Sequence, residues 1–225
     1  MSNNQMSKKE LKAPDYIYRA LATFYRSLRE NFKAIILIAI CVVVATAVIT
    51  AVNYFTSKKE QVASAELFKA LKSTQTADGE VDNNKVVETL NTLLAKLGTS
   101  TVAFVEANYR IAEAYYKLEK YDDAVKSYDV VIAKNNKIYK TLAFMGKAYS
   151  QENKGDFTSA IDSFTQVTKV KEDVVYKAVA MLSIGRCYKK LGQKDKAMEA
   201  YDSVIIAYPD TDYARTASAG KSELN

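Results

Sequence analysis

The chain of 225 residues contains no histidine, only two cysteines and two prolines, and seven glycines. Without histidine, Ser-His and Cys-His catalysis are excluded, as are the usual zinc sites. Glu113 and other carboxylates could in principle serve acid–base chemistry, but no paired constellation of them is recognisable. The sequence therefore predicts no catalytic residue, no metal site and no cofactor, and we expect the protein not to be an enzyme.

The two cysteines lie in different environments. Cys41 is inside an apolar run, so a disulfide to Cys187 would have to join a membrane segment to the soluble part of the chain. We interpret Cys187 as a small packing residue of a helix, because the sequence shows no neighbour that would activate its thiol. The scarcity of glycine and proline, with 48% hydrophobic residues, is typical of a helical globular domain.

The net charge of +6 is unevenly distributed along the chain. Residues 1–33 carry seven Lys and Arg against three Asp and Glu, a net charge of +4. The part after residue 55 carries 25 against 23, a net charge of +2. A nucleic-acid-binding domain would show a strong basic footprint, so the nearly neutral C-terminal part predicts that nucleic acid is not a partner.

The longest apolar run, AIILIAICVVVATAVITAV, covers residues 34–52 and has no charge. At about 1.5 Å per residue it is about 28 Å long, enough to cross the core of a bilayer. We assign residues 34–55 to a single transmembrane helix, because a buried soluble helix would show a polar face. Two weaker alternatives are a signal peptide cleaved at Ala45-Thr46-Ala47 and a lipoprotein signal, in which Ile40 would precede the acylated Cys41.

Residues 14–33 carry a second pattern just before this run. Pro14 and Asp15 form a good helix start. Apolar residues then share one helix face, and basic residues lie on the opposite face. The apolar set is Ile17, Leu21, Phe24, Leu28 and Phe32, and the basic set is Arg19, Arg26, Arg29 and Lys33. This helix is predicted to lie on an anionic inner leaflet or to dock on a membrane partner, unless it merely extends the span and carries topology charges.

The same basic residues bear on orientation. They precede the span, and Lys8, Lys9 and Lys12 extend the bias, whereas Lys58, Lys59 and Lys69 follow the span. The positive-inside rule then favours a cytoplasmic N-terminus and a translocated C-terminal domain.

Three stretches after residue 100 share one pattern. Each has a small residue in a first helix and a tyrosine three residues later. Each second helix has an alanine, an aromatic residue four positions on, and a valine three positions after that. The sets are Ala112, Gly146 and Gly185; Tyr115, Tyr149 and Tyr188; Ala124, Ala160 and Ala197; Tyr128, Phe164 and Tyr201; and Val131, Val167 and Val204. Such spacing puts these residues on one helix face and predicts stacked hairpins, each covering the apolar face of its neighbour.

This pattern resembles the tetratricopeptide repeat. The third copy matches best, with Ile184, Gly185, Tyr188, Ala197, Tyr201, Val204 and Pro209 at consensus positions. It departs from the family because Asn108 and Met181 replace the early tryptophan and because the first two copies lack the terminal proline. The resemblance implies an all-α, right-handed solenoid of helical hairpins, here preceded by one transmembrane helix.

We therefore divide the chain into five parts. Residues 1–33 form a cytoplasmic basic leader with an amphipathic helix, 34–55 the transmembrane helix, and 56–100 a degenerate helical hairpin that joins the span to the array. In that hairpin, helices are expected at residues 59–73 and 86–97. Residues 101–209 form three tetratricopeptide repeats and 210–225 a C-terminal cap helix.

The resemblance also implies that the first helix of each repeat lines a concave groove for a partner. The groove positions are Glu106, Tyr109, Glu113 and Tyr116 in the first repeat, Lys140, Ala143, Lys147 and Ser150 in the second, and Val179, Leu182, Arg186 and Lys189 in the third. All except Ala143, Ser150 and Val179 are our candidate partner-binding residues. Such a groove is acidic and aromatic at one end and basic at the other, which suits an extended peptide, although any single position could be an ordinary solvated residue.

The whole layout resembles the YfgM-like family of ancillary subunits of the Sec translocon. The resemblance implies a chaperone-like adaptor of the bacterial inner membrane, with periplasmic repeats that contact translocon or chaperone components or emerging envelope proteins. The alternative is a structural subunit of a membrane complex, or a homo-oligomer, held through its leader and span.

Overall fold

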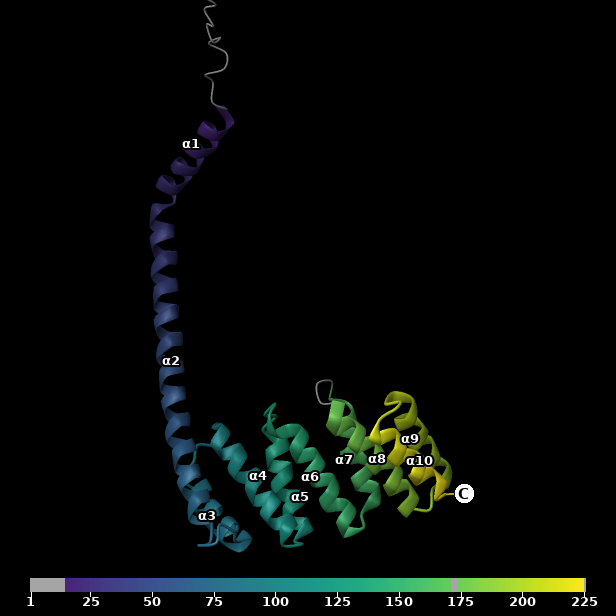
Figure 1. Ribbon diagram of the computed structural model, residues 1–225. Helices are drawn as coiled ribbons and strands as arrows, with labels where there is room; N and C mark the ends of the chain where they lie inside the picture. Colours follow the sequence, from purple (N-terminus) through teal and green to yellow (C-terminus); the bar gives the residue numbers. More distant parts are fainter. Residues whose placement is uncertain (1–14, 171–173, 225) are drawn as a thin grey trace, which may run out of the picture. The chain divides into compact units, whose positions relative to one another are not determined.

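The computed structural model describes residues 15–170 and 174–224, and its regular structure in those ranges is helical (Figure 1). The chain divides into two compact units, residues 1–57 and 58–225. One helix, α2, runs from the first unit into the second.

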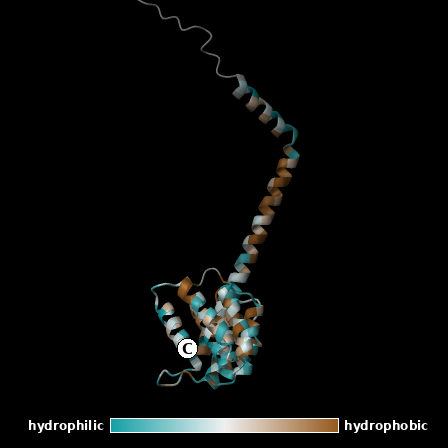
Figure 2. Cartoon of the chain, turned by 90° about the vertical axis from the view of Figure 1, so that its right-hand side faces the viewer, coloured by the Kyte–Doolittle hydropathy of each residue, from teal (hydrophilic) through white to brown (hydrophobic). Residues whose placement is uncertain are grey.

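The N-terminal unit holds helix α1, Asp15–Glu30, and the first part of helix α2, Phe32–Ser73. Asn31 alone separates them, and hydrogen bonds continue across it from Asn31 N to Ser27 O and from Ile35 N to Asn31 O, both 3.0 Å. The apolar part of α2, dominated by hydrophobic residues in Figure 2, is exposed. By length and composition, α2 is the one helix among the described residues that could cross a membrane.

Helix α2 continues to Ser73, so the helix expected at residues 59–73 is the end of α2 and not a separate element. No glycine or proline between residues 34 and 73 ends it. In the C-terminal unit, Ala63 and Leu67 of α2 are buried in one cluster with Leu90 of helix α3, Asn83–Leu94. The side chain of Asp82 caps α3 by accepting hydrogen bonds from two backbone amides, which explains why this helix begins before residue 86.

Seven further helices complete the C-terminal unit: α4, Val102–Lys117; α5, Tyr121–Ala133; α6, Tyr139–Lys154; α7, Phe157–Thr168; α8, Val174–Lys190; α9, Lys194–Ala207; and α10, Asp212–Ser222. Each packs against the next along the chain (Figure 1), and α4 also contacts α6, α6 contacts α8, and α8 contacts α10. The helices therefore form stacked hairpins whose first helices line one side. The predicted all-α repeat solenoid is confirmed.

The packing positions predicted from the repeat pattern are confirmed, except that Tyr115, Tyr149 and Tyr188 are only partly buried against the core clusters. The alanines and valines of the pattern are buried, as are Tyr128, Phe164 and Tyr201. A Cβ atom on Gly146 would lie 2.2 Å from Cζ of Tyr128, and one on Gly185 would lie 2.6 Å from Cε1 of Tyr201. Glycine at these two positions therefore makes room for a tyrosine ring from the second helix.

Helix α10 repeats this contact at the end of the array. A Cβ atom on Gly220 would lie 2.7 Å from Cζ of Tyr201. Gly220 follows Gly185 by 35 residues, close to one repeat, and that spacing is a signal our sequence reasoning missed. Helix α10 thus packs as the first helix of a further repeat that has no second helix among the described residues, and Tyr201 lies between two glycines.

The first repeat is tied to the preceding hairpin through the N-terminus of α4. The carboxylate of Glu60, on α2, accepts hydrogen bonds from Val102 N and Ala103 N at 2.9 and 3.0 Å. Thr101 Oγ1 accepts another from Phe104 N at 3.2 Å. A carboxylate at this end is stabilised by free amides and by the helix dipole, so Glu60 fixes where α4 starts against α2.

Candidate partner-binding groove

A cavity of about 440 Å³ opens between the first helices α4, α6 and α8, and we call it the tyrosine pocket. Five tyrosines line it from four helices: Tyr109, Tyr116, Tyr128, Tyr149 and Tyr176. The remaining wall is mainly apolar, with Leu142, Met145, Gly146, Val175 and Val179, and its charged residues are Glu113 and Lys117. Such a lining combines large apolar rings with several hydroxyls and one carboxylate.

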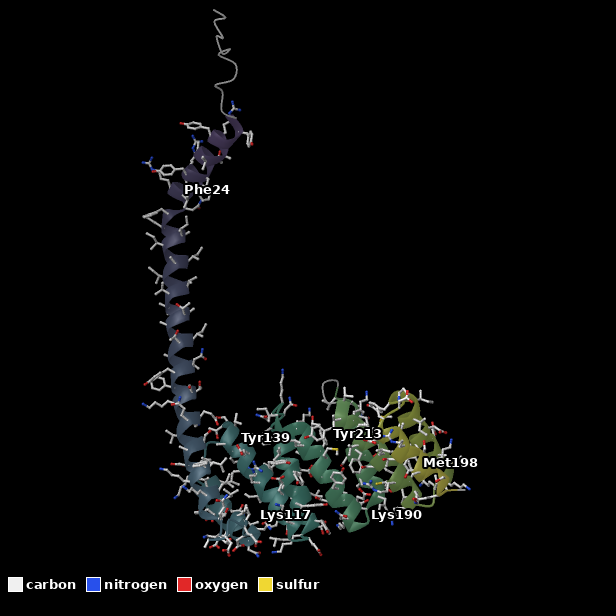
Figure 3. All side chains as sticks on the ribbon, viewed as in Figure 1. Phe24, Lys117, Tyr139, Lys190, Met198 and Tyr213 are labelled. Atoms are coloured by element: carbon white, nitrogen blue, oxygen red, sulfur yellow. The ribbon has the colours of Figure 1, made fainter. Side chains whose placement is uncertain are left out.

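Tyr109 is fixed by two neighbouring rings. It meets Tyr128 edge-on at a centroid distance of 5.9 Å and Tyr139 at 5.4 Å in a tilted arrangement; Tyr139 is labelled in Figure 3. Burial, and then the neighbouring Glu113, raise the pKa of Tyr109. Burial also raises the pKa of Tyr128. Both hydroxyls therefore stay protonated at neutral pH and can donate hydrogen bonds.

Glu113 is part of a chain of charges along α4. Its Oε2 accepts a hydrogen bond from Nη1 of Arg110 at 3.1 Å, and Arg110 also lies 3.5 Å from Oε1 of Glu106. Two carboxylates thus share one guanidinium. On α6, Asn153 Nδ2 donates to Tyr116 Oη at 2.7 Å, which links the first helices of two successive repeats.

The predicted cations of the second repeat lie away from the pocket. Lys147 Nζ donates to Oδ1 of Asp129 on α5 at 2.6 Å, and Lys140 Nζ donates to Oδ1 of Asn135 at 2.7 Å. The other two groove positions of this repeat, Ala143 and Ser150, are buried. None of these four residues lines the tyrosine pocket.

The predicted cations of the third repeat are paired within the chain. Arg186 donates through Nε and Nη2 to both carboxylate oxygens of Glu152, at 2.6 and 2.8 Å. The hydrogen bond to Glu152 raises the pKa of Arg186, so the guanidinium stays positively charged at every pH at which the protein is folded. Lys189 pairs with Glu223, which follows α10. We call the surface formed by these two pairs, Arg186 with Glu152 and Lys189 with Glu223, the ion-paired stretch.

The structure thus brings together only part of the predicted groove. Tyr109, Glu113, Tyr116 and Val179 line the tyrosine pocket. Leu182 packs against the cluster around Tyr201 instead. Sequence reasoning missed Glu152, although it precedes Arg186 by 34 residues, the length of one repeat. It also missed Leu142 and Met145, which precede the repeat glycine Gly146 on α6, and Tyr176, which lies before the repeat pattern of the third copy begins.

Two observations on the described residues concern metal and thiol chemistry. Among them, no group of three or more Cys, Asp or Glu side chains could hold a metal ion. Cys187 is fully buried among the residues of its helix and its neighbours, which confirms its packing role. Burial raises the pKa of its thiol to about 12, so no thiolate is available at neutral pH.

Comparison with known proteins places the repeats. One tetratricopeptide repeat family model matches residues 109–169 and another matches residues 179–211. The RNA polymerase-associated protein CTR9 of Caenorhabditis elegans is 26% identical over 113 residues, which cover 48% of this chain and 10% of that protein. The chain therefore spans only about a tenth of the length of this relative.

Two solved structures share the fold. The crystal structure of the TPR-like repeats of a putative kinesin light chain from Podosopora anserina superposes with a TM-score of 0.52 at 15% identity, covering 75% of this chain and 84% of that one. The crystal structure of MamA protein gives the same TM-score at 16% identity, covering 75% and 87%. Residues 109–169 and 179–211 are therefore tetratricopeptide repeats, and the chain carries a repeat solenoid of the kind that serves as a protein–protein interaction scaffold.

Proposed function

We propose that the protein is a membrane-anchored scaffold that holds an extended segment of another protein against the tyrosine pocket. The observation that carries this proposal is the convergence of five tyrosines from four helices on one open cavity. Tyrosine rings supply contact area at low cost in side-chain entropy, and tyrosine is enriched among the residues that dominate binding energy.

The lining of the pocket indicates the chemistry of the segment. Leu142, Met145 and Val179 offer an apolar floor for a large side chain of the partner. Glu113 can accept a further hydrogen bond, and the tyrosine hydroxyls can both donate and accept. We therefore expect a segment with an apolar or aromatic anchor next to a backbone or side-chain donor.

Anchoring in a membrane is supported by α2, whose apolar part is exposed and long enough to cross a bilayer. The basic residues before the span favour a cytoplasmic N-terminus and translocated repeats. The layout shared with the YfgM-like family supports the bacterial inner membrane as the site of action and translocon or chaperone components as partners. Protease treatment of intact spheroplasts tests this orientation: loss of a C-terminal tag supports it, and full protection contradicts it.

The alternative function is a structural subunit held through the leader and span. The exposed apolar side chains of α1 favour it, because they offer a contact surface outside the repeats. Deleting residues 1–33 while keeping the span separates the two functions. Loss of complex membership indicates the leader, and retention indicates the tyrosine pocket.

Photo-crosslinking in native membranes tests the proposed pocket. A benzophenone amino acid replaces Leu142, inside the pocket, or Ile206, which is exposed on α9. We expect one defined partner to be captured from position 142 and not from position 206, and we expect Tyr109→Ala to abolish its capture. Equal capture from both positions, or full capture in the Tyr109→Ala background, would contradict the proposal.

A further inference from the structure

Helix α1 displays an apolar face that no other described element covers. Leu21 and Phe24 are 61% and 65% exposed, and Phe24 is labelled in Figure 3. Leu28 continues the same face at a spacing of four residues. In a soluble protein such a face would be buried against a core, so its exposure calls for another apolar environment.

The opposite face of α1 is basic and has no ion pairs among the described side chains. Arg19, Arg26 and Arg29 lie there, and Lys33 continues it at the start of α2. Residues 15–33 hold these four cations against Asp15 and Glu30, a net charge of +2. This contrasts with Arg186 and Lys189 in the repeats, each of which has a carboxylate partner. The cations of α1 thus offer their charge to an external anion.

Two tyrosines stand at the boundary between these faces. Tyr18 and Tyr25 are seven residues apart, so they lie on the same side of α1, between the apolar face around Leu21 and the basic face at Arg29. Both are exposed. Tyrosine is enriched at the level of lipid headgroups, because its ring is apolar and its hydroxyl is hydrated.

The connection to α2 fixes where α1 meets a membrane. Only Asn31 separates the two helices, and the apolar run begins at Ala34, about one helical turn after the end of α1. When α2 crosses the bilayer, the end of α1 therefore lies at the headgroup layer. This step rests on the membrane span of the proposed function.

The junction itself has a shape that suits a phospholipid. A hollow of about 480 Å³ is lined by Tyr25, Leu28, Arg29 and Phe32. Its wall is apolar apart from the hydroxyl of Tyr25 and the guanidinium of Arg29, which can bind a phosphate through charge-assisted hydrogen bonds. The part of an acyl chain nearest the headgroup can then lie against Leu28 and the rings of Tyr25 and Phe32.

From these observations we propose that α1 is an interfacial helix that lies on the membrane surface and binds anionic phospholipid. The apolar face enters the boundary between headgroups and acyl chains, and Arg26, Arg29 and Lys33 contact the phosphates. A protein partner for the same face is the competing outcome, and the test below separates the two.

The test uses the full chain in vesicles that contain no other protein. Cys41→Ala and Cys187→Ala remove the native thiols, and a nitroxide is attached at Phe24→Cys on the apolar face or at Ala22→Cys on the polar face. The vesicles contain phosphatidylcholine alone or with about 30% phosphatidylglycerol, and the accessibility of the label to oxygen and to a water-soluble nickel chelate reports its depth.

With phosphatidylglycerol, we expect the label at position 24 to be shielded from the chelate and the label at position 22 to stay accessible. Replacing Arg26, Arg29 and Lys33 by Gln should lower the equilibrium constant between the shielded and the water-exposed state about fivefold for each cation removed. A water-accessible label at position 24 in these vesicles overturns the proposal. Equal shielding without phosphatidylglycerol, or in the triple variant, overturns the role of anionic lipid.

Alkaline extraction of the same vesicles distinguishes failure of this proposal from failure of the span. Retention of the chain together with a water-accessible label at position 24 overturns the interfacial helix alone. Release of the chain overturns the membrane span, and the interfacial helix with it.

Discussion

The tyrosine pocket and the ion-paired stretch are built from copies of the same repeat pattern. The first is an open cavity, whereas the charged side chains of the second are paired with one another. In the pocket, Tyr109 and Glu113 face a cavity of about 440 Å³. In the ion-paired stretch, Arg186 occupies the repeat position equivalent to Glu113 but is held by Glu152 on the neighbouring first helix. A groove position is therefore closed to a partner where the preceding repeat supplies an opposite charge, as Glu152 does for Arg186.

The second-helix tyrosines are buried to the same degree, since Tyr128 is 3% and Tyr201 is 5% exposed. Tyr128 fits against Gly146 and still lines the pocket. Tyr201 fits against Gly185 on one side and Gly220 on the other, so α8 and α10 enclose it. The extra helix at the end of the array thus gives Tyr201 the same kind of glycine contact that α6 gives Tyr128.

The largest expected effect breaks this enclosed core. Tyr201→Ala removes a ring that is 5% exposed and leaves a cavity between α8 and α10, so we expect a loss of about 3–5 kcal/mol in the free energy of unfolding. Tyr109→Ala, at the edge of an open cavity, should cost less, about 1–2 kcal/mol. Urea titration followed by circular dichroism measures both, and equal losses would contradict the contrast.

A second variant opens the ion-paired stretch. Arg186→Ala leaves the carboxylate of Glu152, whose side chain is 13% exposed, without its bidentate partner. We expect a loss of about 1–3 kcal/mol in the free energy of unfolding. Lys189→Ala, at an exposed pair, should cause no loss that urea titration can resolve. A double-mutant cycle with Glu152→Gln isolates the pair, and a coupling energy near zero would show that Arg186 has no structural role.

A third variant tests the added first helix. Gly220→Ala places a Cβ atom 2.7 Å from Cζ of Tyr201. The overpacking exceeds the gain in helix propensity of about 1 kcal/mol, so we expect a net loss of about 1 kcal/mol in stability. Ser218→Ala on the exposed face is the control and should be neutral or slightly stabilising. A stabilised Gly220→Ala variant would show that α10 does not enclose Tyr201.

The smallest effect concerns pH. The pKa of Tyr128 is raised by burial above its value of about 10 in the unfolded chain, so its contribution to stability is complete below pH 10 and is lost as the pH rises further. Between about pH 9 and pH 11, the free energy of unfolding should therefore fall less steeply with pH for Tyr128→Phe than for the unmodified chain. The two slopes should differ by at most about 1.4 kcal/mol per pH unit. Urea titration at several pH values measures both. Tyr18→Phe on exposed α1 is the control, and identical slopes for all three proteins would contradict the burial of the Tyr128 hydroxyl.

The fold was predictable because packing repeats along the sequence. Residues of the same kind as Gly185, Ala197 and Tyr201 stand at the equivalent positions of the other two copies. Each set makes the same contact between helices. That α2 is a single helix was harder to predict. The change from apolar to charged residues near Lys58 indicates a change of surroundings along the helix and not the end of the helix. Only a breaker such as glycine or proline would have marked an end, and residues 34–73 contain neither.

The candidate site was predictable only in part. A repeat position indicates which side of the helix a residue faces, but not which side chain of the same chain it contacts. Tyr109 and Glu113 line the pocket as their positions imply. Arg186 occupies an equivalent position, and its pairing with Glu152 depends on a side chain one repeat earlier. The contact from Glu60 to the start of α4 spans 42 residues and follows no repeat at all.

The central claim is that partners bind at the tyrosine pocket and not at the ion-paired stretch. The most direct test is the affinity of the crosslinked partner for the purified full chain, with Tyr109→Ala and Arg186→Ala compared at a temperature where both remain folded. We predict at least about a tenfold loss of affinity for Tyr109→Ala and no significant loss for Arg186→Ala. Unchanged affinity in Tyr109→Ala together with a loss in Arg186→Ala would contradict the claim and return the binding site to the basic end of the groove.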